Sequence, residues 1–316
     1  MPVITSSTVP FIKLNTGASI PVIGLGCFAG NGANQERRDR VKVWAGTALK
    51  SGYRHLDTAW IYGTEHSVGT AIRESGIPRK EVFVTTKLPW HHPGYVFESI
   101  DESLREAGLD YFDLYLMHFP QATEYPGQGR GRPADAEDPH SIRALEHPTL
   151  NETWADMERV LESGKVKAIG VSNFSIKTLE ELLKTAKVVP AVNQVELHPY
   201  LAQPKLLAYC KSKGIVVTAY TPTGYATVRS DPTITTLANN LGVTPTQLVL
   251  AWHIARGCIV TPKSEDEGRQ KENLELPHLD ESTIRAIDAL DRNERLCNYP
   301  NELGMVYGWT MEQFGW

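Results

Sequence analysis

Ionisable side chains close three consecutive predicted strands of this sequence. Asp57, Lys87 and His118 are each the last residue of such a strand. A buried ionisable group costs free energy unless it is paired, so charged groups at successive strand ends indicate one cluster in which they pair. A salt bridge and a hydrogen-bonded structural histidine would explain any one of them, but three in a row favour a catalytic cluster.

Tyr62 lies five residues after Asp57 and can join this cluster. A phenol has a pKa near 10, and a neighbouring ammonium group lowers that pKa by favouring the phenolate. With Asp57 keeping Lys87 charged, Tyr62 would act as a general acid, and His118 would orient a carbonyl oxygen beside it. The four residues therefore predict proton transfer to a carbonyl group.

Predicted strands and helices alternate along the chain and would bring these residues together. Eight such strands predict an α/β fold of the (β/α)8 TIM-barrel type, one domain over 1–316, with the active site among long loops at the C-terminal face. An N-terminal β-hairpin turns at Gly17, and long segments at 119–148 and 290–316 interrupt the alternation. The predicted strands are 22–25, 53–57, 82–87, 112–118, 168–172, 191–196, 215–219 and 258–261, and the predicted helices are 36–50, 65–74, 95–106, 151–162, 176–183, 203–213 and 246–256.

Composition excludes several other classes of protein. The 316 residues carry a net charge of −5 without a Lys/Arg-rich tract, which argues against a nucleic-acid partner. The cysteines, Cys27, Cys210, Cys258 and Cys297, are far apart and fit neither a zinc site nor a disulfide framework. Without a signal peptide or an apolar run of ~20 residues, the chain is expected to be cytoplasmic, with no membrane partner, as a monomer or homodimer.

Four stretches and the catalytic set together resemble one family, the aldo-keto reductases. The stretches are GYRHLDTA (52–59), GKVKAIGVSNF (164–174), NQVELHP (193–199) and TPKS (261–264), which occur in the family's order. The similarity covers about residues 11–300 and is greatest to the xylose/aldose reductase-like branch, in which phenylalanine follows the histidine.

The resemblance implies an NAD(P)H-dependent oxidoreductase that reduces aldehydes, aldoses or other small polar carbonyls to alcohols. A nicotinamide would deliver hydride and Tyr62 the proton, while Lys87 and Asp57 tune Tyr62 and His118 positions the substrate. By the same resemblance, the groups that bind the nicotinamide end are Ser172, Asn173, Gln194, Tyr220 and Thr221, and those that bind the adenosine-phosphate end are Lys263, Ser264, Glu265, Arg269, Glu272 and Asn273.

The adenosine end favours NADP(H), with NAD(H) as the competitor. Lys263 and Arg269 supply cations for a 2′-phosphate. Glu265 and Asp266, however, occupy positions where family members usually carry neutral residues. A carboxylate there would repel a 2′-phosphate or accept a hydrogen bond from the 2′-hydroxyl of NAD(H), unless both side chains point into solvent.

The substrate is less well specified. The resemblance places it beside His118 and four aromatic side chains, Phe28, Trp60, Trp90 and Phe119. Proline precedes Trp90, where the family usually has tryptophan directly after leucine, so that ring is expected to be displaced. Arginines of the 119–148 segment leave open a reductase of sugar acids such as uronates, with Arg130, Arg132 and Arg143 binding the carboxylate, although a solvated basic loop is the simpler interpretation.

Three other interpretations of the sequence compete with the reductase. Gly24–Ala29 fits the dinucleotide motif G-x-G-x-x-A, but a loop-like stretch follows it instead of a helix, so a Rossmann fold is rejected. A metal-dependent hydrolase using Asp57, His118 and His198 fails on spacing, and no metal is expected. A catalytically idle barrel that binds nucleotide as a sensor or structural protein stays open, although retention of the catalytic set argues against it.

Overall fold

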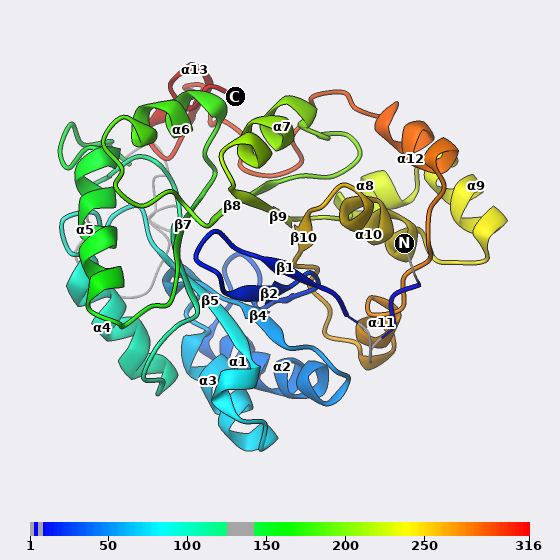
Figure 1. Cartoon of the computed structure of the whole chain (residues 1–316), viewed down its shortest axis with the longest axis horizontal. Coiled ribbons are helices and arrows are strands. Elements are labelled where there is room, and N and C mark those ends of the chain that lie inside the picture. Colours follow the sequence, from blue (N-terminus) through cyan, green and yellow to red (C-terminus); the bar gives the residue numbers. More distant parts are fainter. Residues whose placement is uncertain (1–2, 6–8, 125–141) are drawn as a thin grey trace.

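The computed structural model describes residues 3–5, 9–124 and 142–316, and its centre is a closed parallel barrel (Figure 1). The eight strands follow one another in chain order from β3 to β10, and all neighbours are parallel. A parallel bridge between Ile23 and Val260 joins the first strand to the last and closes the ring. The barrel strands are β3 (Leu25–Gly26), β4 (His55–Asp57), β5 (Phe83–Leu88), β6 (Leu114–Met117), β7 (Ile169–Ser172), β8 (Val192–Glu196), β9 (Val216–Tyr220) and β10 (Ile259–Val260). The predicted TIM barrel is confirmed.

Helices surround the barrel, and most of them match the predicted ones. The predicted helix 36–50 is divided in two at Arg40, and the first part is capped by Asn34, whose side chain accepts a hydrogen bond from the Arg37 amide. The structure also contains helices that were not predicted: α8, α9, α11, α12 and α13. The helices are α1 (Gln35–Asp39), α2 (Val41–Lys50), α3 (Glu65–Ser75), α4 (Val96–Ala107), α5 (Leu150–Glu162), α6 (Ile176–Leu183), α7 (Pro204–Ser212), α8 (Tyr225–Arg229), α9 (Pro232–Leu241), α10 (Pro245–Ala255), α11 (Glu267–Glu272), α12 (Glu281–Asp288) and α13 (Met311–Phe314), with 3₁₀ turns at Trp60–Tyr62 and Arg79–Glu81.

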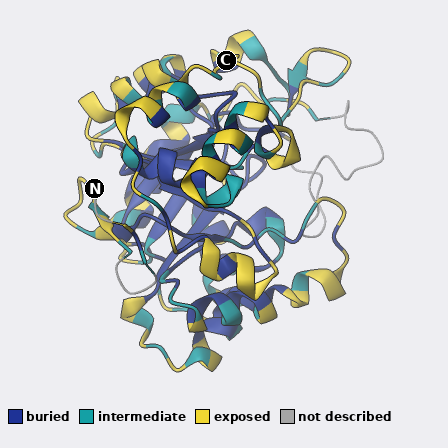
Figure 2. Ribbon diagram, turned by 90° about the vertical axis from the view of Figure 1, so that its right-hand side faces the viewer, coloured by how far each residue is buried: buried dark blue, intermediate teal, exposed yellow. Residues whose placement is uncertain are grey.

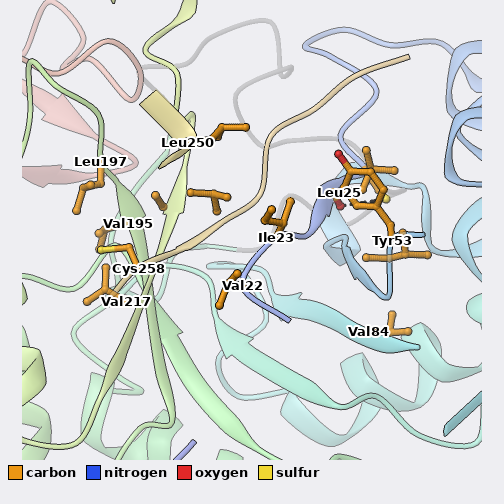
Figure 3. Packing of buried hydrophobic residues seen from close by; sticks show 14 of the residues in the cluster. Val22, Ile23, Leu25, Tyr53, Val84, Val195, Leu197, Val217, Leu250 and Cys258 are labelled. Atoms are coloured by element: carbon orange, nitrogen blue, oxygen red, sulfur yellow. Dashed lines mark hydrogen bonds between the residues drawn. The ribbon is translucent and has the colours of Figure 1, made fainter. Parts of the chain in front are cut away.

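Apolar side chains fill the layer between the barrel and its helices. Strand residues such as Val84, Val195 and Val217 belong to one buried cluster with helix residues such as Leu250 (Figure 3). The buried parts of the chain accordingly lie on the strands, and exposed residues cover the outer helix faces (Figure 2). Among the described residues, no helix is long and apolar enough to cross a membrane.

The predicted N-terminal hairpin is present and covers one end of the barrel. Its strands, β1 (Phe11–Lys13) and β2 (Ser19–Pro21), pair antiparallel and lie in the middle of the ring of helices (Figure 1). Leu14 and Ile20 of the hairpin are buried in a cluster with residues of the barrel interior. Because this end is plugged, the open end is the one at which the strands terminate. A second hairpin, β11 (Met305–Val306) and β12 (Trp309–Thr310), lies in the C-terminal tail.

The glycines of the rejected dinucleotide motif serve the barrel. A Cβ on Gly24 would lie 2.6 Å from the His55 ring, and one on Gly26 would lie 2.9 Å from the Thr261 carbonyl oxygen. Both glycines therefore permit close packing between neighbouring strands. No helix begins at Ala29, since α1 starts only at Gln35, so the rejection of a Rossmann fold is confirmed.

Candidate active site

Asp57, Lys87 and Tyr62 meet at the carboxyl ends of β4 and β5. Lys87 Nζ donates to Asp57 Oδ1 at 2.6 Å and to the Thr58 carbonyl at 2.8 Å, and it lies 5.2 Å from the centre of the Tyr62 ring. Both members of the ion pair are buried, with side-chain exposures of 0% and 5%. Burial lowers the pKa of Lys87, but the Asp57 carboxylate and Tyr62 together raise it more, so the net pKa lies above its ordinary value. The lysine therefore stays charged beneath the tyrosine.

His118 and aromatic side chains surround Tyr62. The rings of Tyr62 and His118 are 5.9 Å apart and nearly perpendicular, and Phe28 packs 4.9 Å from Tyr62 on another side. Trp90 lies 5.8 Å from His118 despite the proline that precedes it in the sequence, and Phe119 stacks on His118 at 5.5 Å. Tyr62 thus sits in a mainly aromatic pocket.

One cavity of about 770 Å³ runs past these groups to the nucleotide-binding residues expected from the sequence. Its size is within the range of about 300–1,000 Å³ that is usual for ligand pockets. Predicted residues that line it are Asp57, Tyr62, His118, Phe28, Trp90, Phe119, Asn173, Gln194, Tyr220, Thr221, Lys263, Ser264, Arg269, Glu272 and Asn273. The lining does not include Lys87, Ser172, Glu265 or Trp60. Trp60 packs instead against the rings of His91 and His92 at 5.3 and 4.4 Å.

Amide and hydroxyl groups form a network beside the catalytic cluster. Gln194 Nε2 donates to Asp57 Oδ2 at 2.7 Å, and Ser172 Oγ donates to the Gln194 carbonyl at 2.8 Å. Asn173 Nδ2 donates to the His118 carbonyl at 2.9 Å, while its Oδ1 accepts from Tyr220 Oη at 2.6 Å. The amide nitrogens of Gln194 and Asn173 are used in these bonds, so a ligand meets chiefly their amide oxygens, each of which has a further lone pair to accept from the NH₂ of a carboxamide.

Glu265 forms ion pairs with Lys263, a residue of the cavity lining, and with Arg37. Its Oε1 accepts from Lys263 Nζ at 3.0 Å and from Arg37 Nη2 at 2.7 Å, so it does not simply point into solvent. Burial raises the pKa of Glu265, but hydrogen bonding and charge from Lys263, followed by the charge of Arg37, lower it overall. Asp266 instead caps α11, because its side chain accepts a hydrogen bond from the Arg269 amide at 2.9 Å.

The C-terminal tail supplies cavity residues that are not part of the predicted site. Asn298 donates to Tyr220 Oη at 2.8 Å, and Tyr307 stacks on Trp90 with ring centres 4.2 Å apart. Both line the cavity, as do Cys27 and Cys297. The buried carboxylate of Glu196 anchors this part of the tail by accepting from the Leu296 and Cys297 amides and pairing with Arg295 and His198.

Arg143 and His198, which belong to the two alternative sites, do not line the cavity. Arg143 is exposed and does not line the cavity, and Arg130 and Arg132 lie outside the described residues. His198 is buried, and its hydrogen bond is to Glu196, not to Asp57 or His118. Within the described ranges, no group of three His, Cys, Asp or Glu side chains is placed to hold a metal ion.

A parallel barrel with a buried Asp–Lys pair beneath a tyrosine, and a cavity with carboxamide acceptors, defines a class of nicotinamide-dependent oxidoreductase. The sequence profile of the aldo/keto reductase family matches residues 22–292. NADP(+)-dependent glycerol 2-dehydrogenase of Saccharomyces cerevisiae is 42% identical over 319 residues, covering 95% of this chain and 97% of the relative. An aldehyde reductase of the same yeast is 40% identical over 305 residues, covering 92% and 94%.

A solved structure agrees with these sequence relatives. The Bombyx mori aldo-keto reductase in complex with NADP matches with a TM-score of 0.81 and 36% identity, covering 92% of this chain and 95% of that one. The chain belongs to the aldo/keto reductase family. It is an NAD(P)-dependent oxidoreductase that reduces aldehydes and other carbonyls.

Proposed function

We propose that this protein is an NADPH-preferring reductase of aldoses and other small polar aldehydes, with Tyr62 as the proton donor. The observation that carries the proposal is the buried Lys87–Asp57 pair, which is set beneath Tyr62 at the cavity. Bound reduced nicotinamide would supply the hydride. The other steps belong to residues of this chain.

Lys87 has three N–H groups, and the structure accounts for two of them. They bind Asp57 Oδ1 and the Thr58 carbonyl, so the third remains for Tyr62. A hydrogen bond with Tyr62 is also one of the causes that raise the pKa of Lys87. A charged donor at the tyrosine oxygen stabilises the phenolate that forms when Tyr62 gives up its proton. His118, whose ring faces Tyr62 edge-on, would hold the carbonyl oxygen at the point of proton transfer.

The nicotinamide would be oriented by the hydrogen-bonded groups beside this cluster. Asn173 and Gln194 line the cavity and their side-chain oxygens offer acceptors to its carboxamide, while the Tyr220 ring offers a flat surface for stacking. Ser172 lies behind them and donates to the Gln194 carbonyl. Tyr220 Oη donates to Asn173 Oδ1 and accepts from Asn298 Nδ2, and these two hydrogen bonds hold the ring in position.

NADPH preference is supported by the charges at the adenosine end and by the relatives. Lys263, Ser264, Arg269, Glu272 and Asn273, which the resemblance assigns to this end, line the cavity, as does Thr221. The yeast glycerol 2-dehydrogenase is named for NADP(+), and the silkworm structure contains NADP. Glu265 favours use of NADH as a second cofactor, because its carboxylate competes with a 2′-phosphate for Lys263.

Oxidation of NADPH, and separately NADH, with glyceraldehyde, xylose, glucuronate, galacturonate and a nitrobenzaldehyde tests the proposal. Tyr62→Phe is expected to lower kcat by about 10²–10⁴-fold, the usual contribution of general acid catalysis, while NADPH binding is retained. Tyr307→Phe, another tyrosine of the cavity lining, is the matched control and is expected to stay active.

Two results would contradict this function. Activity of Tyr62→Phe equal to that of the parent would remove Tyr62 as the proton donor. Tight NADPH binding without turnover of any carbonyl would favour the idle, nucleotide-binding barrel. Against a thiol-based sensor at Cys27, burial raises the pKa of its thiol above the ordinary value, which disfavours the reactive thiolate.

A further inference from the structure

Helix α8 is held firmly at the nucleotide end of the cavity. The chain turns sharply before it, with positive φ angles at Thr221, Gly224 and Tyr225. His253 Nε2 donates to the Pro222 carbonyl at 2.8 Å and fixes the start of this turn. Val228, within the helix, is completely buried. The side chain that follows Val228 is therefore presented from a fixed backbone.

That side chain is Arg229, which lines the cavity together with Arg269. Arg229 is partly buried, and Nη1 donates to the neutral hydroxyl of Thr223 at 3.0 Å. None of the ion pairs formed among the described residues includes Arg229. Its charge is therefore unbalanced by any carboxylate of that part of the chain.

Arg269 adds a second positive charge to the cavity lining that is only weakly balanced. Its Nε lies 3.8 Å from Asp266 Oδ1, and its side chain is 69% exposed, so this ion pair is weak. Both guanidinium groups line the same cavity, and the pKa of Arg229 is lowered by burial and by the positive charge of Arg269. Two like charges at one end of a cavity are stabilised when an anion binds beside both.

We propose that Arg229 determines cofactor specificity by joining Arg269 in binding the 2′-phosphate of NADP(H). This inference rests on the proposed NADPH-dependent function. A guanidinium group suits the task because its planar N–H groups match phosphate oxygens. The 2′-phosphate is favoured over the pyrophosphate because Arg269, which the family resemblance assigns to the 2′-phosphate, lines the same cavity and is the charge that acts on Arg229.

Calorimetric titration with 2′,5′-ADP and with 5′-ADP tests the inference without requiring turnover. Arg229→Gln is expected to weaken 2′,5′-ADP about tenfold, as the loss of a charged hydrogen bond does, and to change 5′-ADP by less than about twofold. Arg229→Lys is expected to recover most of the affinity because it keeps the charge. Arg285→Gln is the matched control, since it removes an equal charge from an exposed site on α12, outside the cavity.

The dependence of 2′,5′-ADP affinity on ionic strength is a second measurement, and it would not change if Arg229 had only a structural role. The affinity of the parent for 2′,5′-ADP should fall with rising ionic strength more steeply than that of Arg229→Gln. Equal weakening of both nucleotides would overturn the inference, because it indicates stacking on adenine or a folding defect. No change in either nucleotide would overturn it as well.

Failure of this inference is distinguishable from failure of the proposed function. If the parent reduces aldehydes with NADPH while Arg229→Gln binds both nucleotides as the parent does, only the inference fails. If the parent reduces no carbonyl but Arg229→Gln selectively loses 2′,5′-ADP, the inference holds and the reductase function fails.

Discussion

Replacing Asp57 with asparagine tests the buried pair at the centre of the site. The substitution keeps the size of the side chain but leaves the Lys87 ammonium, which is fully buried, without its carboxylate partner at 2.6 Å. Removing one member of a buried ion pair typically costs about 3–5 kcal/mol. Lys87 keeps the Thr58 carbonyl as an acceptor, so we expect a loss near the lower limit, about 3 kcal/mol in the free energy of unfolding.

The pH dependence of that loss has a definite sign. In the parent, the pKa of Lys87 is raised on folding, so its contribution is fully present below the unfolded value near 10.5 and is lost as pH rises through the folded value. In Asp57→Asn, burial is opposed only by Tyr62, so the pKa of Lys87 falls below the unfolded value and stability increases with pH over that interval. The difference in stability between parent and variant should therefore shrink from pH 7 toward pH 11.

Urea unfolding at a series of pH values measures both effects, and the double variant Asp57→Asn/Lys87→Met is the control. Neutralising both partners should recover much of the lost stability, because the cost arises from a lone buried charge. Parallel stability curves for the parent and Asp57→Asn across this pH range would refute the reasoning. Additive losses in the double variant would refute it too.

Two further predictions concern the ends of the cavity. Glu265→Gln releases Lys263 from an ion pair that is about one third exposed, so fluorescence titration should show NADPH binding about two- to fivefold more tightly, with NADH unchanged. Asp266→Asn removes the same charge one residue away but keeps the helix cap, and equal tightening in this control would contradict a specific role for Glu265. Tyr307→Ala removes the ring stacked on Trp90 and should raise KM for aldehydes about two- to tenfold. An equal rise in the Kd for NADPH would instead indicate collapse of the whole cavity.

Local patterns account for what could be predicted from the sequence. The alternation of strands and helices along the chain was sufficient to predict the barrel. The polar residues that end successive strands were sufficient to predict that Asp57, Lys87 and His118 converge. Some missed elements also had readable local signals, such as Asp231 followed by Pro232 at the start of α9, where aspartate caps the helix and proline occupies its first turn.

Other features depend on contacts between distant parts of the chain, for which the sequence contains no local pattern. The pairing of Glu265 with Arg37 joins residues 228 positions apart. Asn298 reaches Tyr220 only because buried Glu196 binds the tail backbone at Leu296 and Cys297. Arg229 likewise acquires a role from the turn that places α8 at the cavity, since nothing in its neighbours along the chain indicates an anion.

The structure also explains why the reaction class follows from motifs while the substrate does not. The carboxylate of Asp57 binds Lys87 through one oxygen and Gln194 through the other, so one buried group fixes both the partner of the proposed proton donor and a residue of the proposed amide-binding set. These residues come from strand ends of a rigid barrel and cannot move independently. The wall that a substrate would touch comes from separate loops and the tail, through Phe28, Trp90 and Tyr307. Changes in those loops alter the shape of the wall without disturbing the Asp57 cluster, so aldehyde selectivity is expected to vary among relatives that share the same chemistry.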